Sequence, residues 1–365
     1  MRRVLLFLSF IFFLYASWTV YVKLEGNTSN QSVISTITDE MDFSIVTDKI
    51  KDSLEYIITI FQEKNDQLPQ DQKRPNLTSP KDQVFSVYNI ELGNTKSEVE
   101  RQAGVPQRTS SNEYGVQWYT YHENYQNFVM VAYDDTDKVA GLYTNQDLIS
   151  SSKGIKQGST KSFVHDTLGD PLIKILKGTV YYQFQDDRDY DMFHLDDSYV
   201  TIFYDKHQKN TVTAMQIIGE QLEESKTEFY TEASKNLKEG FEYQLFDLTN
   251  AERINHGLTI LSWDDHVKET ARKHSYDMAE NQYFSHTNLQ GQSPFDRMLE
   301  DEVMFNFAGE NLAFGQFSSI FAHEGLMNSL GHRENILQKE YEFLGVGVAF
   351  DSESHPYFTE NFYAN

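Results

Sequence analysis

The sequence repeats one motif at a fixed distance, and this repeat constrains the fold of the first half of the chain more than any other feature. Residues 93–106 begin with Gly-Asn-Thr-Lys-Ser and end with Gly-Val-Pro, and residues 158–171 begin with Gly-Ser-Thr-Lys-Ser and end with Gly-Asp-Pro. Every matched position is offset by 65 residues. A Thr or Ser after a Gly turn is typical of a helix start, and Gly-x-Pro is typical of a helix end. We therefore expect one short helix in each copy.

Three strand-like runs of β-branched and aromatic residues follow each helix motif. They lie at 116–121, 128–133 and 138–143 in the first copy, and at 179–184, 199–204 and 211–218 in the second. Since the same order recurs, the pattern predicts two α+β units that pack as one duplicated domain over residues 85–219. No motif with obvious chemistry lies in it, so we interpret it as a scaffold or binding domain.

A long uncharged segment at the N-terminus indicates export. Arg2 and Arg3 precede the apolar run Val4–Val22, whose 19 residues are about long enough to cross a hydrocarbon core. The arginines should stay cytoplasmic, which places the rest of the chain outside. Bulky aromatic residues crowd the place where signal cleavage needs small ones, so the pattern favours a retained anchor over residues 1–23. We predict a single-pass membrane protein with extracytoplasmic domains, or a secreted protein if this segment is cleaved.

Composition narrows the partners and the chemistry. The chain has 31 Lys and Arg against 55 Asp and Glu, a net charge of −24, so nucleic acid is not an expected partner. It has no Cys, which excludes disulfides, thiolate metal sites and a Cys nucleophile. Residues 24–84 are polar and contain three prolines, which predicts a linker or stalk. Charged residues predict a connector helix over 220–240, before a last domain at 241–365.

The last domain has the pattern of helices around a small antiparallel sheet. Apolar residues recur at helical spacing over 245–254, and a second helix is predicted over 264–281. Two strands are predicted near the end, at 345–350 and 357–363. This domain also holds 7 of the 11 histidines, so polar chemistry is concentrated there.

Four short motifs of this last domain combine histidines, glutamates and asparagines. They are Tyr-Phe-Ser-His ending at His286, Gly-Glu-Asn-Leu-Ala around Glu310, His-Glu-Gly-Leu-Met-Asn-Ser around Glu324, and Gly-His-Arg-Glu-Asn around His332. In this order and spacing they resemble the CAP superfamily of cysteine-rich secretory, antigen-5 and pathogenesis-related proteins, over residues 243–363. The repeated motif is similar to the CAP-associated N-terminal domain of bacterial members. The absence of Cys differs from the disulfide-linked eukaryotic members and agrees with bacterial ones.

The resemblance implies an α-β-α sandwich with a cleft formed by His286, Glu310, Glu324 and His332. Two imidazoles can hold a divalent metal, with zinc the first candidate, and leave open positions for water or ligand. The two carboxylates would serve as further ligands or would orient the imidazoles by hydrogen bonds. They are also the candidate catalytic residues, because a carboxylate can act as a general base.

Simpler interpretations exist for the same residues. A single His or Glu can cap a helix, end a turn or face solvent. His323-Glu324 begins like the zinc-protease motif His-Glu-x-x-His, but Met327 stands where the second His is needed. Helix-borne protease chemistry of that type is therefore not predicted.

Three functions remain open on sequence grounds. We favour a membrane-anchored binding or signalling module whose cleft recognises a peptide, lipid or cell-wall fragment, and so expect a binding protein rather than an enzyme. The second is a scaffold in which the cleft residues form a non-catalytic polar network. The third is a metal-dependent hydrolase of peptidase type.

Overall fold

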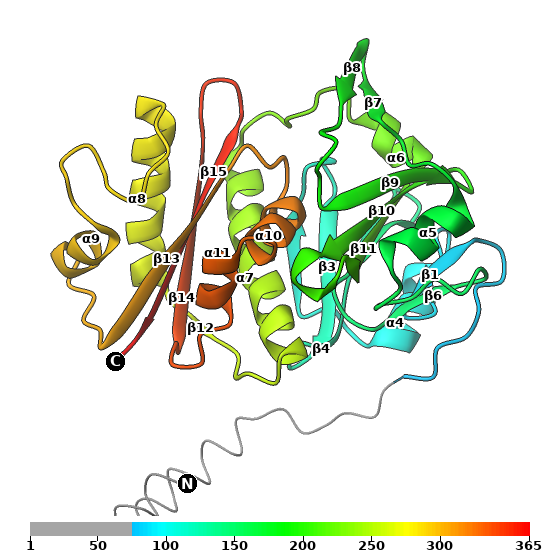
Figure 1. The fold of residues 1–365 in the computed structure, drawn as a ribbon, viewed down its shortest axis with the longest axis horizontal. Helices are drawn as coiled ribbons and strands as arrows, with labels where there is room; N and C mark the ends of the chain where they lie inside the picture. The colour runs from blue at the N-terminus through cyan, green and yellow to red at the C-terminus, as the bar shows by residue number, and fades with distance from the viewer. Residues whose placement is uncertain (1–74) are drawn as a thin grey trace, which may run out of the picture. The chain divides into compact units, whose positions relative to one another are not determined.

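The computed structural model describes residues 75–365. The predicted membrane segment at 1–23, and the predicted linker up to residue 74, lie outside the described residues. Within 75–365, no helix combines the length and the apolar composition that crossing a membrane requires. The described part has a mixed α+β fold with two main sheets, one in each half (Figure 1).

The repeat region, residues 85–219, is built on a seven-stranded antiparallel sheet of order β2-β3-β4-β5-β11-β10-β9 (Figure 1). Its strands are β2 (Arg108–Ser111), β3 (Gln117–Glu123), β4 (Gln126–Tyr133), β5 (Val139–Thr144), β9 (Tyr190–Leu195), β10 (Ser198–Asp205) and β11 (Thr211–Gly219). Two small pairs flank it: β1 (Phe85–Val87) with β6 (Ile149–Ser151), and β7 (Lys174–Lys177) with β8 (Val180–Gln183). Each of the six strand-like runs predicted from the sequence forms a strand, while the remaining strands were not predicted.

Two short helices begin and end as the repeated motif predicts. They are α4 (Lys96–Ala103) and α5 (Lys161–Leu168). The side chains of Thr95 and Thr160 each accept a hydrogen bond from a backbone N–H of the first turn, which stabilises the helix start. Gly104 and Gly169 follow at φ of 81° and 85°, a backbone region that glycine adopts at little cost.

The predicted connector helix over 220–240 is wrong in its middle. The chain forms α6 (Glu220–Ser225), irregular backbone over 226–234 and then α7 (Lys235–Asn255), which starts from Ser234 as its N-cap. The reason lies in Phe229, whose ring stacks on Tyr182 at 4.7 Å and meets Phe317 at 5.0 Å between centroids. The irregular backbone at 226–234 lets this ring pack between Tyr182 of the repeat region and Phe317 of the C-terminal region.

The C-terminal region is a three-layer arrangement around a four-stranded sheet of order β12-β14-β15-β13. Its strands are β12 (Ser262–Trp263), β13 (Phe307–Phe314), β14 (Phe343–Phe350) and β15 (Pro356–Ala364). The helices α8 (Asp265–Asn281) and α9 (Pro294–Glu300) lie on one side of it, and α7, α10 (Ser319–Met327) and α11 (Leu330–Ile336) lie on the other (Figure 1). The predicted helix α8 and the two predicted late strands, β14 and β15, are confirmed; β13 was not predicted.

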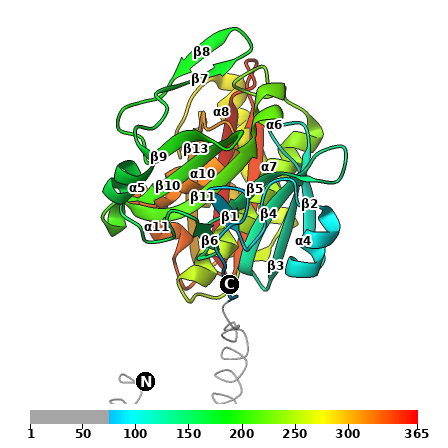
Figure 2. The same cartoon turned by 90° about the vertical axis from the view of Figure 1, so that its right-hand side faces the viewer.

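Helix α7 joins the two regions, and Figure 2 views them with the repeat sheet in front. A Cβ atom at Gly240 would lie 2.0 Å from the carbonyl oxygen of Ser111, so only glycine lets α7 approach β2 this closely. The amide of Gln244 donates to Ser110 Oγ and Ser111 O at 3.0 and 2.8 Å. One apolar cluster continues through both regions and includes Trp118, Phe203, Phe241, Phe321 and Phe358. The repeat region and the C-terminal region therefore share a core.

Candidate functional site

Glu310, predicted from the family resemblance to line a cleft, is a buried residue at the edge of the C-terminal sheet, and we keep the name cleft for the cluster of side chains around it. It lies in β13, its side chain is 1% exposed, and its Oε1 lies 2.9 Å from Nδ1 of His286. Its other oxygen, Oε2, accepts a hydrogen bond from Nη2 of Arg297 at 2.6 Å. Both carboxylate oxygens thus have a partner, and one of these partners is a permanent cation, which is the usual condition for burying a carboxylate.

Arg297 is a residue of this site that sequence reasoning missed. It lies buried in helix α9, whose start is fixed by a capping box at Ser293 and by Pro294 at its first position. The guanidinium also donates to the carbonyl oxygens of His286 and Gln292, at 2.8 and 3.1 Å. The only sequence signal was a single cation on the buried side of a very short helix, and such a residue more often lies at the surface.

His332 approaches the same cleft from α11. The side chain of Asn311, on β13, donates to its carbonyl oxygen at 3.1 Å. The side chain of Asn335 donates to the carbonyl oxygen of Glu310 at 3.2 Å and to Asn311 Oδ1 at 3.0 Å. Burial and the nearby His286 lower the pKa of His332, so its ring is neutral at physiological pH.

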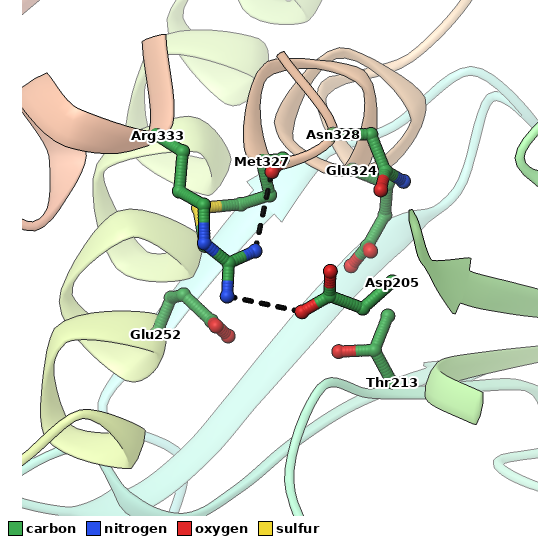
Figure 3. A pocket seen from close by; sticks show the side chains of 7 residues that line it. All are labelled: Asp205, Thr213, Glu252, Glu324, Met327, Asn328 and Arg333. Atoms are coloured by element: carbon green, nitrogen blue, oxygen red, sulfur yellow. Dashed lines mark hydrogen bonds and ion pairs between the residues drawn. The ribbon is translucent and has the colours of Figure 1, made fainter. Parts of the chain in front are cut away.

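Glu324 lies in a different place from the other three candidates. Its carboxyl, on α10, accepts a hydrogen bond from the hydroxyl of Tyr143 in β5 at 2.6 Å, across the boundary between the two regions. It lines a small buried pocket, shown in Figure 3, whose other lining residues are Asp205, Thr213, Glu252, Met327, Asn328 and Arg333. Burial raises the pKa of Glu324 to about 8. We name this the interdomain pocket.

A single ion pair dominates the interdomain pocket. Arg333 Nη2 lies 3.0 Å from Asp205 Oδ2, with side chains only 12% and 6% exposed (Figure 3). His323 is fully buried near Glu252 and Arg333, and among the described residues neither of its ring nitrogens has a hydrogen-bond partner. Burial lowers the pKa of His323 to about 4, so this histidine is neutral at physiological pH.

Family models match both halves of the chain. The CAP-associated N-terminal domain matches residues 92–229, and the cysteine-rich secretory protein family matches residues 246–362. The uncharacterized membrane protein YlbC of Bacillus subtilis is 31% identical over 291 residues, which cover 74% of this chain and 82% of YlbC. The uncharacterized protein YkwD of the same organism is 37% identical over 137 residues, 38% of this chain and 52% of YkwD.

The chain belongs to the CAP family. It is a member of the bacterial type with a CAP-associated N-terminal domain, as its motifs predict.

Two solved structures share the fold of this CAP protein. An extracellular SCP-domain protein from Bacillus anthracis has a TM-score of 0.65 and 24% identity, covering 81% of this chain and 100% of that one. A cysteine-rich secretory protein from Staphylococcus aureus has a TM-score of 0.61 and 15% identity, covering 79% of this chain and 97% of that one. At these identities the likeness concerns the fold, and it extends over both regions.

The CAP domain therefore brings three of the four predicted cleft residues together. His286, Glu310 and His332 share the cleft, with Arg297 as an additional member, while Glu324 contacts Tyr143 of the repeat region instead. Across residues 75–365, no three His, Cys, Asp or Glu side chains gather in a way that would hold a metal ion.

The donor set of the cleft fits a metal only through its two imidazoles. Glu310 has both oxygens engaged, and the adjacent guanidinium of Arg297 disfavours a cation on that carboxylate. A carboxylate that accepts a hydrogen bond from Nδ1 fixes the tautomer of His286 and leaves its Nε2 lone pair available. A metal here would have His286 and His332 as protein ligands and would take its remaining ligands from water or from a bound molecule.

Proposed function

We propose that the cleft of the CAP domain is a ligand-binding site, in a module that acts outside the cytoplasm and is held at the membrane by its N-terminal segment. The observation that carries the proposal is the contrast within one hydrogen-bonded pair. Glu310 is 1% exposed, whereas the imidazole that it orients, on His286, is 51% exposed. A buried, fully bonded carboxylate that holds an accessible imidazole in one orientation is typical of a preorganised recognition site.

The location part of this proposal has two supports. Arg2 and Arg3 precede an apolar run, Val4–Val22, of suitable length for a single span. YlbC, with which this chain shares 31% identity, is named a membrane protein. We propose the same location for this chain, with the repeat region and the CAP domain on the outer side.

The ligand class follows from what the cleft offers. The imidazoles of His286 and His332, with a divalent metal such as zinc, would bind an oxygen donor of the ligand, such as a carboxylate or a phosphate. Peptides, cell-wall fragments and lipid headgroups all carry such groups. Because the protein supplies only two ligands, metal affinity should be modest alone and should rise when the ligand completes the coordination.

The hydrogen bonds of Glu310 and the exposure of His286 help to choose between this binding function, a hydrolase and a structural network. A metal-dependent hydrolase needs a carboxylate free to accept a proton from water, and here both oxygens are engaged by His286 and Arg297. A purely structural network would favour a buried imidazole over one that is half exposed. The binding function is therefore the better supported of the three.

The decisive test is zinc titration of the full chain in detergent micelles, by calorimetry. We expect one zinc per chain, lost in the double variant His286→Ala/His332→Ala. The matched control is His355→Ala, because His355 also places its Nδ1 2.9 Å from a carboxylate, that of Asp351, outside the cleft. Affinity should fall as pH drops through the histidine range near about 6.5, because protons compete for the imidazoles. Absence of binding by folded wild type, or binding unchanged in the double variant, would refute the metal-assisted site.

A further inference from the structure

Helix α11 is held on two sides by different parts of the molecule. On one side, Asn335 and the carbonyl oxygen of His332 bond to β13 in the cleft. The next residue, Arg333, points to the repeat region, since consecutive residues of a helix diverge by about 100°. The cleft histidine and the interdomain arginine are therefore neighbours on one short, rigid element.

Asp205 binds Arg333, and Asp205 is itself held by the backbone of the residues that follow it. It ends strand β10, and its Oδ1 accepts hydrogen bonds from the backbone N–H groups of His207 and Gln208 at 2.8 and 3.2 Å. Its Oδ2 remains for Arg333, at 3.0 Å. The guanidinium also donates to the carbonyl oxygen of Met327 at 3.2 Å, at the end of α10 (Figure 3). The ion pair therefore has a defined geometry on both sides.

The turn between α10 and α11 is bound by the same part of the repeat region. Asn328 donates to the carbonyl oxygen of Tyr204 at 2.9 Å and accepts from the backbone N–H of Lys206 at 3.0 Å. The ring nitrogen Nε2 of His207 lies 3.1 Å from the carbonyl oxygen of Asn328. Residues 204–207 thus bind the start of the segment that carries His332, and Asp205 also binds Arg333 within α11.

We propose that the repeat region determines where His332 stands in the cleft, and that Asp205 is a positioning residue that acts through Arg333. This inference rests on the proposed function, because it takes the cleft as the ligand site. It gives the repeat region a role beyond that of a spacer: a change in how it docks would change the distance between the two cleft imidazoles. By thermodynamic reciprocity, a ligand that draws the imidazoles together would also strengthen the docking of the two regions.

The test uses Asp205→Asn in the full chain. Asparagine keeps a side-chain oxygen for the turn at 206–208 but removes the charge that binds Arg333. Arg333→Met removes the other partner. The matched control is Asp247→Asn, which breaks a second ion pair between the two regions, that of Arg108 Nε with Asp247 Oδ2 at 2.9 Å, on α7 and away from α11.

Two readouts separate this proposal from the proposed function. Hydrogen exchange, measured by mass spectrometry on peptides covering 328–337, should accelerate in Asp205→Asn and Arg333→Met and stay at the wild-type rate in Asp247→Asn. Zinc affinity should fall about tenfold in the first two, as for residues that orient a metal ligand, and remain unchanged in the third. The double variant Asp205→Asn/Arg333→Met should match the single ones.

Unchanged exchange in Asp205→Asn, or equal acceleration in Asp247→Asn, would overturn the positioning role. If folded wild type binds no zinc, the metal-assisted site fails, yet the exchange result still decides whether Asp205 holds α11.

Discussion

The cleft and the interdomain pocket each bury a glutamate of the CAP domain, and they do so by opposite means. In the cleft, Glu310 has a guanidinium on one oxygen and an imidazole on the other. In the pocket, the hydroxyl of Tyr143 is the only hydrogen-bond donor to Glu324 within residues 75–365, and Glu252 and Asp205 add negative charge around it. The first glutamate is paired with a buried guanidinium, whereas burial favours a proton on the second.

This difference explains why a resemblance of motifs gave three of the four cleft residues. A motif fixes a residue type at a position in the fold, but its partners come from whatever packs beside it. In this chain the repeat region packs beside α10, so Tyr143 and not an imidazole of the cleft bonds to Glu324. Of the four predicted cleft residues, three lie together, with Arg297 as a further member. The fourth, Glu324, lies in the interdomain pocket instead.

Of the variants considered, Arg297→Met should reduce the stability of the folded chain most. It leaves Glu310 buried without its cation, and breaking a buried pair in this way costs about 3–5 kcal/mol. Urea unfolding of the full chain, followed by tryptophan fluorescence, measures the loss. The control is Arg101→Met at the exposed end of α4, where a change within about 0.5 kcal/mol is expected.

A double variant tests whether the loss in Arg297→Met comes from the carboxylate of Glu310. Adding Glu310→Met to Arg297→Met removes the stranded charge, so the double variant should be more stable than the single one. If the double variant loses more stability than Arg297→Met alone, the carboxylate does not depend on the guanidinium and the account of the cleft is wrong.

The local elements were predictable from sequence because they depend on short-range chemistry. Helices α4 and α5 follow from the Thr cap and the closing Gly, and β14 and β15 follow from their apolar runs. Strand β13 was missed because Gly309, Glu310 and Asn311 are poor strand formers that the flanking layers hold in place. The interruption at 226–234 was missed because Phe229 is directed by partners far away in sequence.

Only the site residues that belong to the sequence motifs could be predicted. His286, Glu310 and His332 stand in the motifs, whereas Arg297 has a common local context and becomes part of the cleft only through the packing of α9 on β13. Asp205 and Tyr143 lie in the other region and gain their roles from docking. Long-range polar contacts of this kind leave no periodic signal in a single sequence.

Tyr143→Phe should cause the next largest loss of stability. It removes the hydroxyl that bonds to Glu324 and leaves a fully buried carboxyl without its donor, which costs about 1–3 kcal/mol. The same urea measurement applies. The control is Tyr276→Phe, whose side chain is exposed and should change stability by less than about 0.5 kcal/mol. An effect of Tyr143→Phe as small as that of its control would mean that the hydrogen bond between the regions is not maintained in solution.

The smallest predicted effect is a dependence of stability on pH that belongs to Glu324. Its pKa rises from an ordinary 4.5 to about 8 through burial, so between these values the folded chain holds a proton that the unfolded chain releases. Stability due to this group is therefore complete below about pH 4.5 and is lost as pH rises towards 8. Between pH 7 and 8 the expected loss is about 1 kcal/mol, and Glu324→Gln should abolish it, because glutamine still accepts from Tyr143 but does not titrate.

The window from pH 7 to 8 separates Glu324 from the other buried acids of the described chain. Burial raises the pKa of Glu360 and of Glu113 to about 7 and that of Asp247 to about 6, so their contributions fall mainly below pH 7. Glu360→Gln is the matched control: it should flatten the fall below pH 7 and leave the fall from 7 to 8 intact. If Glu324→Gln has the same slope as wild type between pH 7 and 8, Glu324 is already ionised in the folded chain. The pocket would then bury two or more charges against one arginine, and the contrast with the cleft would disappear.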